Sequence, residues 1–221
     1  MLFRSAIAKP PRHLLALAAI GLGVLALPVE AGTPFCALRD PSSQIFQMNP
    51  HATAYRSIIK KIDLSVRRRV MERVGFDLHA RELGQHTLYV ALNRKEPIGL
   101  VHVRSELSDW GLVEVAWALD LDLRIVDFRF QRCRGPACDS AEHDESLGQS
   151  LRGQGLEDLR ARLGRRATSA AKEPGSDAAK MLETLVRSAL KTIAVTEVAW
   201  GDEIDRLRRP SRPSSGGGGG L

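Results

Sequence analysis

The chain of 221 residues has few aromatic residues, few cysteines and none of the common phosphate-binding or hydrolase motifs. Aromatic residues make up only 5% of the chain and are not interleaved with its basic clusters. The sequence therefore gives little support for the aromatic stacking surfaces and basic grooves that bind nucleic acids, and we expect no nucleic-acid partner. The three cysteines are too few for a disulfide-stapled scaffold and lack zinc-ligand spacing. No G-x-S-x-G, Walker or G-x-G-x-x-G pattern is present, so the sequence assigns no catalytic residue.

The composition is that of a globular chain with room for one domain, or for two small ones. Apolar residues make up 43% of the chain and charged residues 26%. The formal net charge is +6, but part of the basic excess is confined to the first 13 residues and to residues 206–221. These values exclude a multi-pass membrane protein and a collagen-like chain.

The first 31 residues have the three parts of a secretory signal peptide. Basic residues within 1–13 precede an apolar run over 14–28, and Val29 and Ala31 stand at positions −3 and −1. We therefore expect cleavage after Ala31 and a periplasmic location. The alternative is an uncleaved membrane anchor. Because the run is shorter than the roughly 20 residues of a spanning helix and ends at Pro28, we expect no membrane span after cleavage.

The rest of the chain is divided into three parts. Prolines punctuate residues 32–51, which we expect to form an extended arm. Residues 52–207 are predicted to form a single domain. The tail over 208–221 contains five consecutive glycines and is expected to be disordered.

Between Thr53 and Val74, apolar residues recur at every third or fourth position, which predicts an amphipathic helix. They are Tyr55, Ile58, Ile59, Ile62, Val66, Val70 and Val74. The arginine run over 67–69 is interpreted as a solvated face of this helix, and the alternative is a patch for a partner or a lipid headgroup.

The middle of the chain alternates between apolar and polar residues, which predicts strands over 87–92, 98–104, 112–119 and 126–131. Short polar links join them, as in an antiparallel meander with one buried face. A loop is expected from Cys133 to Leu156, then a short helix to Leu163. A long helix is expected from Asp177, with Ser176 or Asp177 as its N-cap. The predicted fold class is α+β, with a four-stranded antiparallel meander flanked by an N-terminal amphipathic helix and a C-terminal helix.

Cys133 and Cys138 flank a four-residue spacer that contains Gly135-Pro136. Such a spacer turns tightly enough for a disulfide, and an oxidising compartment favours one. A structural disulfide is therefore preferred over a thioredoxin-type redox pair, which has two intervening residues. The acidic stretch that follows, over 139–145, is interpreted as a solvated loop rather than a metal site, because it lacks the EF-hand pattern.

The order of the elements, together with particular residues, resembles the FMN-binding domain of bacterial envelope redox proteins. That family includes small subunits of Rnf and sodium-pumping NADH:quinone oxidoreductase complexes and NosR-like regulators. The strand pair over 111–130, the segment over 150–163 and the last helix are similar to the family's core. The family's H-x-E-T-P-G-L-G loop corresponds here to His143, Glu145, Ser146 and Gly148, with Leu147 in place of the proline-glycine step.

The resemblance implies a non-covalent FMN site. His143, Glu145, Ser146 and Gly148 would line the isoalloxazine, and the turn at Gly175 and Ser176 would receive the phosphate at a helix start. Covalent attachment is not expected, because Ser176 and Asp177 replace the Ala and Thr of the family's S-G-A-T motif. Thr168 would be a substitute only in a shifted register.

Two functions follow from this resemblance. The first is an exported FMN-binding-domain-like protein that serves envelope electron transfer with a redox partner. The second is a non-catalytic periplasmic interaction module on the same fold, which binds no flavin and docks a protein partner. The colour of the purified protein separates them, and enzymatic activity is left open.

Overall fold

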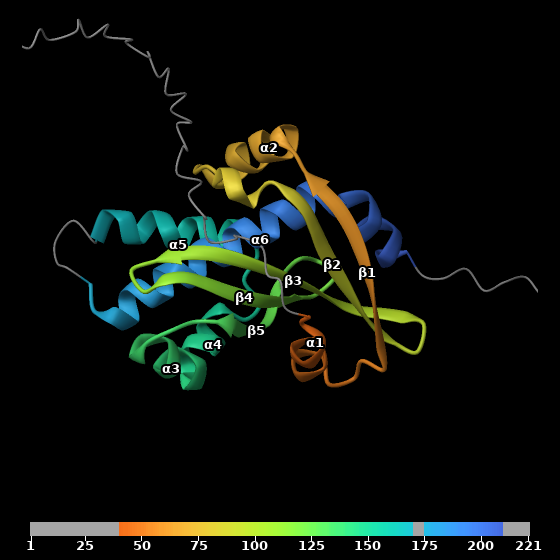
Figure 1. Ribbon diagram of the computed structural model, residues 1–221, viewed down its shortest axis with the longest axis horizontal. Helices are drawn as coiled ribbons and strands as arrows, with labels where there is room; N and C mark the ends of the chain where they lie inside the picture. Colours follow the sequence, from red (N-terminus) through yellow and green to blue (C-terminus); the bar gives the residue numbers. More distant parts are fainter. Residues whose placement is uncertain (1–39, 170–174, 210–221) are drawn as a thin grey trace, which may run out of the picture. The chain divides into compact units, whose positions relative to one another are not determined.

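The computed structural model describes residues 40–169 and 175–209 (Figure 1). The predicted signal peptide, Cys36 and the tail from residue 210 lie outside the described residues, and so does the predicted arm before Asp40. The side chain of Thr168 is not described either. These expectations stay predictions.

Five strands form one antiparallel sheet in chain order. They are β1 (Ala54–Ile62), β2 (Gly84–Asn93), β3 (Glu96–Ser108), β4 (Gly111–Leu119) and β5 (Ile125–Arg132). The structure therefore confirms the α+β class, the antiparallel meander and the C-terminal helix. It adds one strand to the four that the alternation predicted.

The additional strand corrects the predicted helix over residues 53–74. β1 pairs with β2, with Ile58 opposite Leu88, and the helix α2 (Leu64–Val74) begins only afterwards. The Asp63 carboxylate caps α2 by accepting hydrogen bonds from the N–H groups of Ser65 and Val66. The apolar residues before Asp63 suit either a helix or a strand. β2 decides between them because it supplies a ladder of backbone hydrogen bonds.

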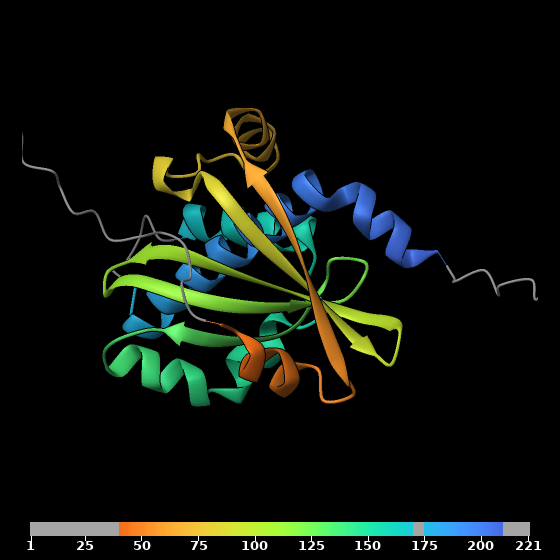
Figure 2. The same ribbon diagram turned by 45° about the vertical axis from the view of Figure 1, so that its right-hand side comes forward.

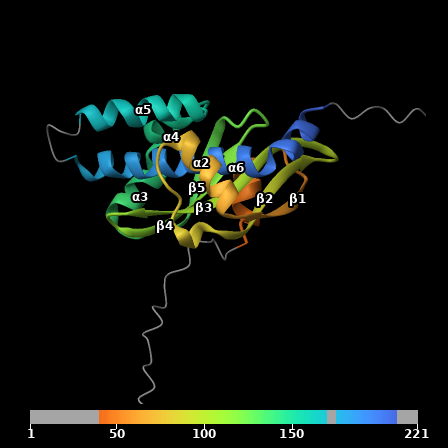
Figure 3. The same ribbon diagram turned by 90° about the horizontal axis from the view of Figure 1, so that it is seen from above.

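The two faces of the sheet are covered differently. The long helix α6 (Asp177–Arg208) packs on one face, and Figure 3 shows α5 (Leu156–Ser169) beside it. The short helix α1 (Ser42–Met48) lies on the opposite face (Figure 2), where Ile45 and Met48 pack against β-strand residues. The predicted arm is therefore helical over part of its described length.

The main hydrophobic core lies between the sheet, α2 and α6. Trp117 of β4 and Trp200 of α6 are its largest fully buried side chains. The indole N–H of Trp117 donates to Ser188 Oγ over 3.0 Å, so α6 is attached to the centre of the sheet by a hydrogen bond as well as by packing.

The segment from Cys133 to Leu156 is more ordered than the predicted loop. It forms α3 (Pro136–His143) and α4 (Glu145–Leu151). Gly135, with φ 103°, and Pro136 begin α3, and the Asp144 carboxylate caps α4. The sulfur atoms of Cys133 and Cys138 are 1.93 Å apart, at disulfide distance.

α5 is longer than the predicted helix, since it continues past Leu163 to Ser169. α6 extends to Arg208. The predicted start of α6 is confirmed, since Ser176 Oγ accepts a hydrogen bond from the Ala179 N–H over 3.3 Å.

Candidate functional site

A cavity of about 870 Å³ lies where three elements meet: the short 3₁₀ helix η1 (Ala80–Glu82), the end of β3 and the first half of α6. We call it the η1–β3–α6 cavity. Nine of its lining side chains are charged: Arg67, Asp77, Glu82, Glu106, Asp109, Lys180, Glu183, Arg187 and Lys191.

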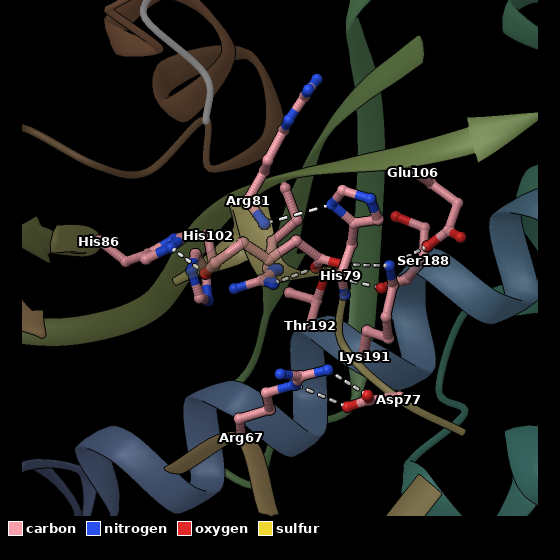
Figure 4. A network of polar contacts seen from close by, with 12 residues as sticks. Arg67, Asp77, His79, Arg81, His86, His102, Glu106, Ser188, Lys191 and Thr192 are labelled. Atoms are coloured by element: carbon pink, nitrogen blue, oxygen red, sulfur yellow. Dashed lines mark hydrogen bonds and ion pairs between the residues drawn. The ribbon is translucent and has the colours of Figure 1, made fainter. Parts of the chain in front are cut away.

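At the floor of this cavity one ammonium group is shared by two carboxylates (Figure 4). Lys191 Nζ lies 3.0 Å from Glu82 Oε1 and 2.6 Å from Glu106 Oε2. The three side chains are only 5%, 2% and 7% exposed. They come from η1, β3 and α6, so folding brings the three charges together from distant parts of the chain.

Glu82 has two further partners. Arg104 Nη2 donates to Glu82 Oε2, and the backbone N–H of His79 donates to Oε1 over 2.9 Å. Burial alone would raise the pKa of Glu82, but Arg104, Lys191 and the His79 N–H together lower it below its usual value. Glu82 is therefore held as a carboxylate.

Glu106 behaves in the opposite way. Burial raises its pKa, and the nearby Lys191 ammonium offsets this only in part. Two carboxylates that share one ammonium are thus pushed apart in pKa, and Glu106 is the one that takes up a proton more readily. This gives the cavity floor a group that exchanges protons under milder conditions than an ordinary glutamate.

Two buried histidines lie beyond Arg104. His86 Nε2 is 2.8 Å from the Glu82 carbonyl oxygen, and burial followed by the Arg104 charge lowers the pKa of His86 to about 4. His102 is fully buried, and its pKa is lowered well below the usual value for the same two reasons. Thr196 Oγ1 donates to the Thr192 carbonyl and so accepts from His102 Nδ1. Both rings are neutral near pH 7.

Ion pairs already formed within the chain surround the mouth of the cavity. Arg67 pairs with Asp77, and Lys180 Nζ lies 2.9 Å from Asp109 Oδ2. The Arg187 guanidinium lies 4.4 Å from the centre of the Phe76 ring, and its Nε is 4.0 Å from Glu106 Oε1.

The six residues predicted to bind flavin lie elsewhere, and none of them lines this cavity. His143 ends α3 and Glu145 begins α4. Ser146 and Gly148 lie within α4. Within these helices the His143 ring contacts the Asp139 carbonyl, and Ser146 Oγ donates to Asp144 over 2.6 Å. Gly175 and Ser176 immediately precede α6.

Among the residues whose side chains the structure describes, no three or more His, Cys, Asp or Glu side chains are grouped as metal ligands would be. In the same part of the chain, no helix has both the length and the apolar character needed to cross a membrane.

Sequence reasoning missed the charged residues of the cavity floor. One signal was available, because His102, Arg104 and Glu106 alternate along β3 and therefore share a face, the one covered by α6. Lys191 likewise stands three and four residues before Ala194 and Val195, which are buried residues of α6. Charged residues at positions expected to be in the core mark a buried polar network.

Comparisons with known proteins leave the family open. No family model matches the chain, and neither does any curated protein or solved structure. The resemblance to FMN-binding domains stays a prediction.

Proposed function

We propose that this chain is a small-molecule-binding protein whose polar ligand occupies the η1–β3–α6 cavity. The observation that carries the proposal is the Lys191 ammonium shared by the buried Glu82 and Glu106 at the cavity floor. Buried charges contribute little to stability, because desolvation offsets most of their attraction. Convergent polar groups in a concave site are, by contrast, the usual means of orienting a ligand.

The hydroxyl groups of the cavity favour binding over nucleophilic catalysis. Ser108 Oγ donates to the Gly111 carbonyl over 3.0 Å, and Thr184 Oγ1 donates to the Lys180 carbonyl over the same distance. A nucleophilic hydroxyl instead requires a neighbouring base that accepts its proton. Both hydroxyls serve the backbone, and the charged side chains make up most of the remaining polar lining.

The test is a nuclear magnetic resonance screen of polar small molecules against the uniformly labelled protein. We expect hits to shift the backbone amides of residues 80–82, 106–109 and 180–191. Glu106→Gln should weaken those hits. Glu203→Gln should not, since Glu203 of α6 also pairs with a lysine, Lys60 of β1, but lies outside this cavity. Hits that map elsewhere, or that survive Glu106→Gln unchanged, would overturn the proposal.

Non-covalent flavin binding is a second candidate function, carried by the start of α6. Ser176 caps this helix at the place where the resemblance puts the FMN phosphate, and the first turn of a helix presents backbone N–H groups to such an anion. Under this proposal the protein is exported and serves envelope electron transfer. Yellow protein that absorbs near 450 nm and releases FMN on denaturation would support it. A colourless protein that ignores added FMN would instead favour the interaction module.

A further inference from the structure

The floor of the η1–β3–α6 cavity presents a carboxylate oxygen without a close donor. Glu106 uses Oε2 for its contact with Lys191. In the described part of the chain, the one ion-pair contact of Oε1 is Arg187 Nε, at 4.0 Å, which is too long for a hydrogen bond. Because Glu106 lines the cavity and is otherwise buried, a ligand that reaches the floor meets this oxygen.

The charges around the cavity do not favour an anion. Its lining holds four basic side chains, of Arg67, Lys180, Arg187 and Lys191, against five acidic ones. Arg67, Lys180 and Lys191 each have a carboxylate partner within 3.0 Å. An anionic ligand would have to compete with these partners, whereas a cationic one would join Glu106 and displace only its long 4.0 Å contact with Arg187.

The wall between floor and mouth is partly apolar. Leu78 and Ala80 contribute to the lining, and Leu107 lines the mouth with 56% of its surface exposed. Such a surface suits a short hydrocarbon stem that connects a charged group at the floor to the solvent.

We infer that the ligand of this cavity is a small organic cation, an ammonium or guanidinium group on an apolar stem, held by Glu106 Oε1. This inference rests on the proposed function and specifies its ligand class. The cation would donate a hydrogen bond to Oε1. It would also add a positive charge beside Glu106, which shares the Lys191 ammonium with Glu82.

The test compares three probes with the same stem and different headgroups: n-butylammonium, n-butanol and n-butanoate. Each is titrated at neutral pH into the full protein, and the amide shifts of residues 80–82, 106–109 and 180–191 are followed. We expect saturable shifts from n-butylammonium. The affinity for n-butanol should be at least about tenfold weaker, because its hydroxyl can also donate to Oε1 but lacks the positive charge that strengthens the bond of an ammonium to a carboxylate.

Two variants make the assignment specific. Glu106→Gln should weaken the affinity for n-butylammonium by about tenfold or more, while the matched Glu203→Gln control leaves this affinity unchanged. Arg187→Gln removes the competing guanidinium beside Oε1 and should strengthen n-butylammonium binding.

The opposite pattern would overturn the inference. If n-butanoate binds in the cavity, n-butylammonium does not, and Arg187→Gln abolishes the binding, the ligand class is anionic and the small-molecule-binding function still stands. If none of the three probes, nor any hit of the wider screen, shifts the cavity amides, both the inference and the proposed function fail.

Discussion

The indole N–H of Trp200 donates a 3.1 Å hydrogen bond to the backbone carbonyl of Ile58. A side chain near the end of the described chain thus fixes β1, which lies at the edge of the sheet. The ring itself is completely buried and also packs against His102, with ring centres 5.2 Å apart.

We predict that Trp200→Phe lowers the free energy of unfolding by about 1–3 kcal/mol, because the Ile58 carbonyl loses its donor in a partly buried setting. Urea denaturation gives the stability. Hydrogen exchange should be accelerated by the substitution more strongly in β1 than in β4. Trp110→Phe is the control, since Trp110 is only partly buried. Equal losses in both variants would contradict the role given to the hydrogen bond.

Arg104→Met should be among the most destabilising single changes, at about 3–5 kcal/mol, because it leaves Glu82 buried with one cation fewer. Adding Glu82→Gln should restore part of the loss, and a double-mutant cycle measures the coupling. Lys180→Met, which breaks a solvent-exposed pair, should have a much smaller effect. Additive losses from Arg104→Met and Glu82→Gln would show that the two side chains do not interact.

Stability should fall as the pH is lowered from 6.5 towards 4. The folded protein keeps His86 neutral with a pKa of about 4, whereas the unfolded chain takes up a proton near pH 6.5. The lowered pKa therefore stabilises the fold fully above pH 6.5, and about 3 kcal/mol is lost on descending to pH 4. His102 acts in the same direction.

The groups that face these histidines include Glu82, Arg104 and the neutral Thr196. Glu82, whose pKa is lowered, loses its stabilising effect only below about pH 4.5. Glu106, whose pKa is raised, stabilises the fold at low pH and opposes the histidines. Urea denaturation between pH 4.5 and 7.5 gives the free energy of unfolding as a function of pH. The rise of this free energy with pH should be shallower for His86→Gln and steeper for Glu106→Gln than for the original protein. An unchanged slope in His86→Gln would refute the assignment.

Removal of the Cys133–Cys138 pair should cost little. The loop that this pair closes is short, so Cys133→Ala/Cys138→Ala should lower stability by about 2 kcal/mol at most. Thiol counting on the unreduced protein provides the direct check. It should leave one reactive thiol per chain, that of Cys36, and three would contradict the bridge.

The parts of the fold that were predictable are those whose signals are local. Ser176 is recognisable as a cap because its hydroxyl serves a backbone N–H three residues later. The alternation in β4 similarly identifies a strand. The prediction of one buried face is wrong for β4, because α1 packs on the face opposite α6 and both faces are buried. Ile58 and Ile62, by contrast, fit a helix and a strand equally well. Their state is decided by pairing with β2, where Ile58 lies opposite Leu88 and Ile62 opposite Gly84.

The candidate site was not predictable in the same way. Glu82 and Lys191 are 109 residues apart in sequence, and the sequence around each of them does not distinguish it from an ordinary charged residue. A pattern search places single charges on the surface, because a buried charge is stable only when its partners are present. Those partners are supplied by η1, β3 and α6 together, an arrangement that belongs to the tertiary fold.

The position of α6 at the end of the described chain has a consequence for biosynthesis. This helix contacts β1, β3 and β4, and also packs against α2, α3 and α5. Until it has been translated, the apolar sheet face lacks its largest cover, and exposed apolar surface of this kind is prone to aggregation. The nascent chain is therefore expected to depend on a holding chaperone until its last helix is released. A ribosome stalled before Asp177 would present a persistent chaperone substrate.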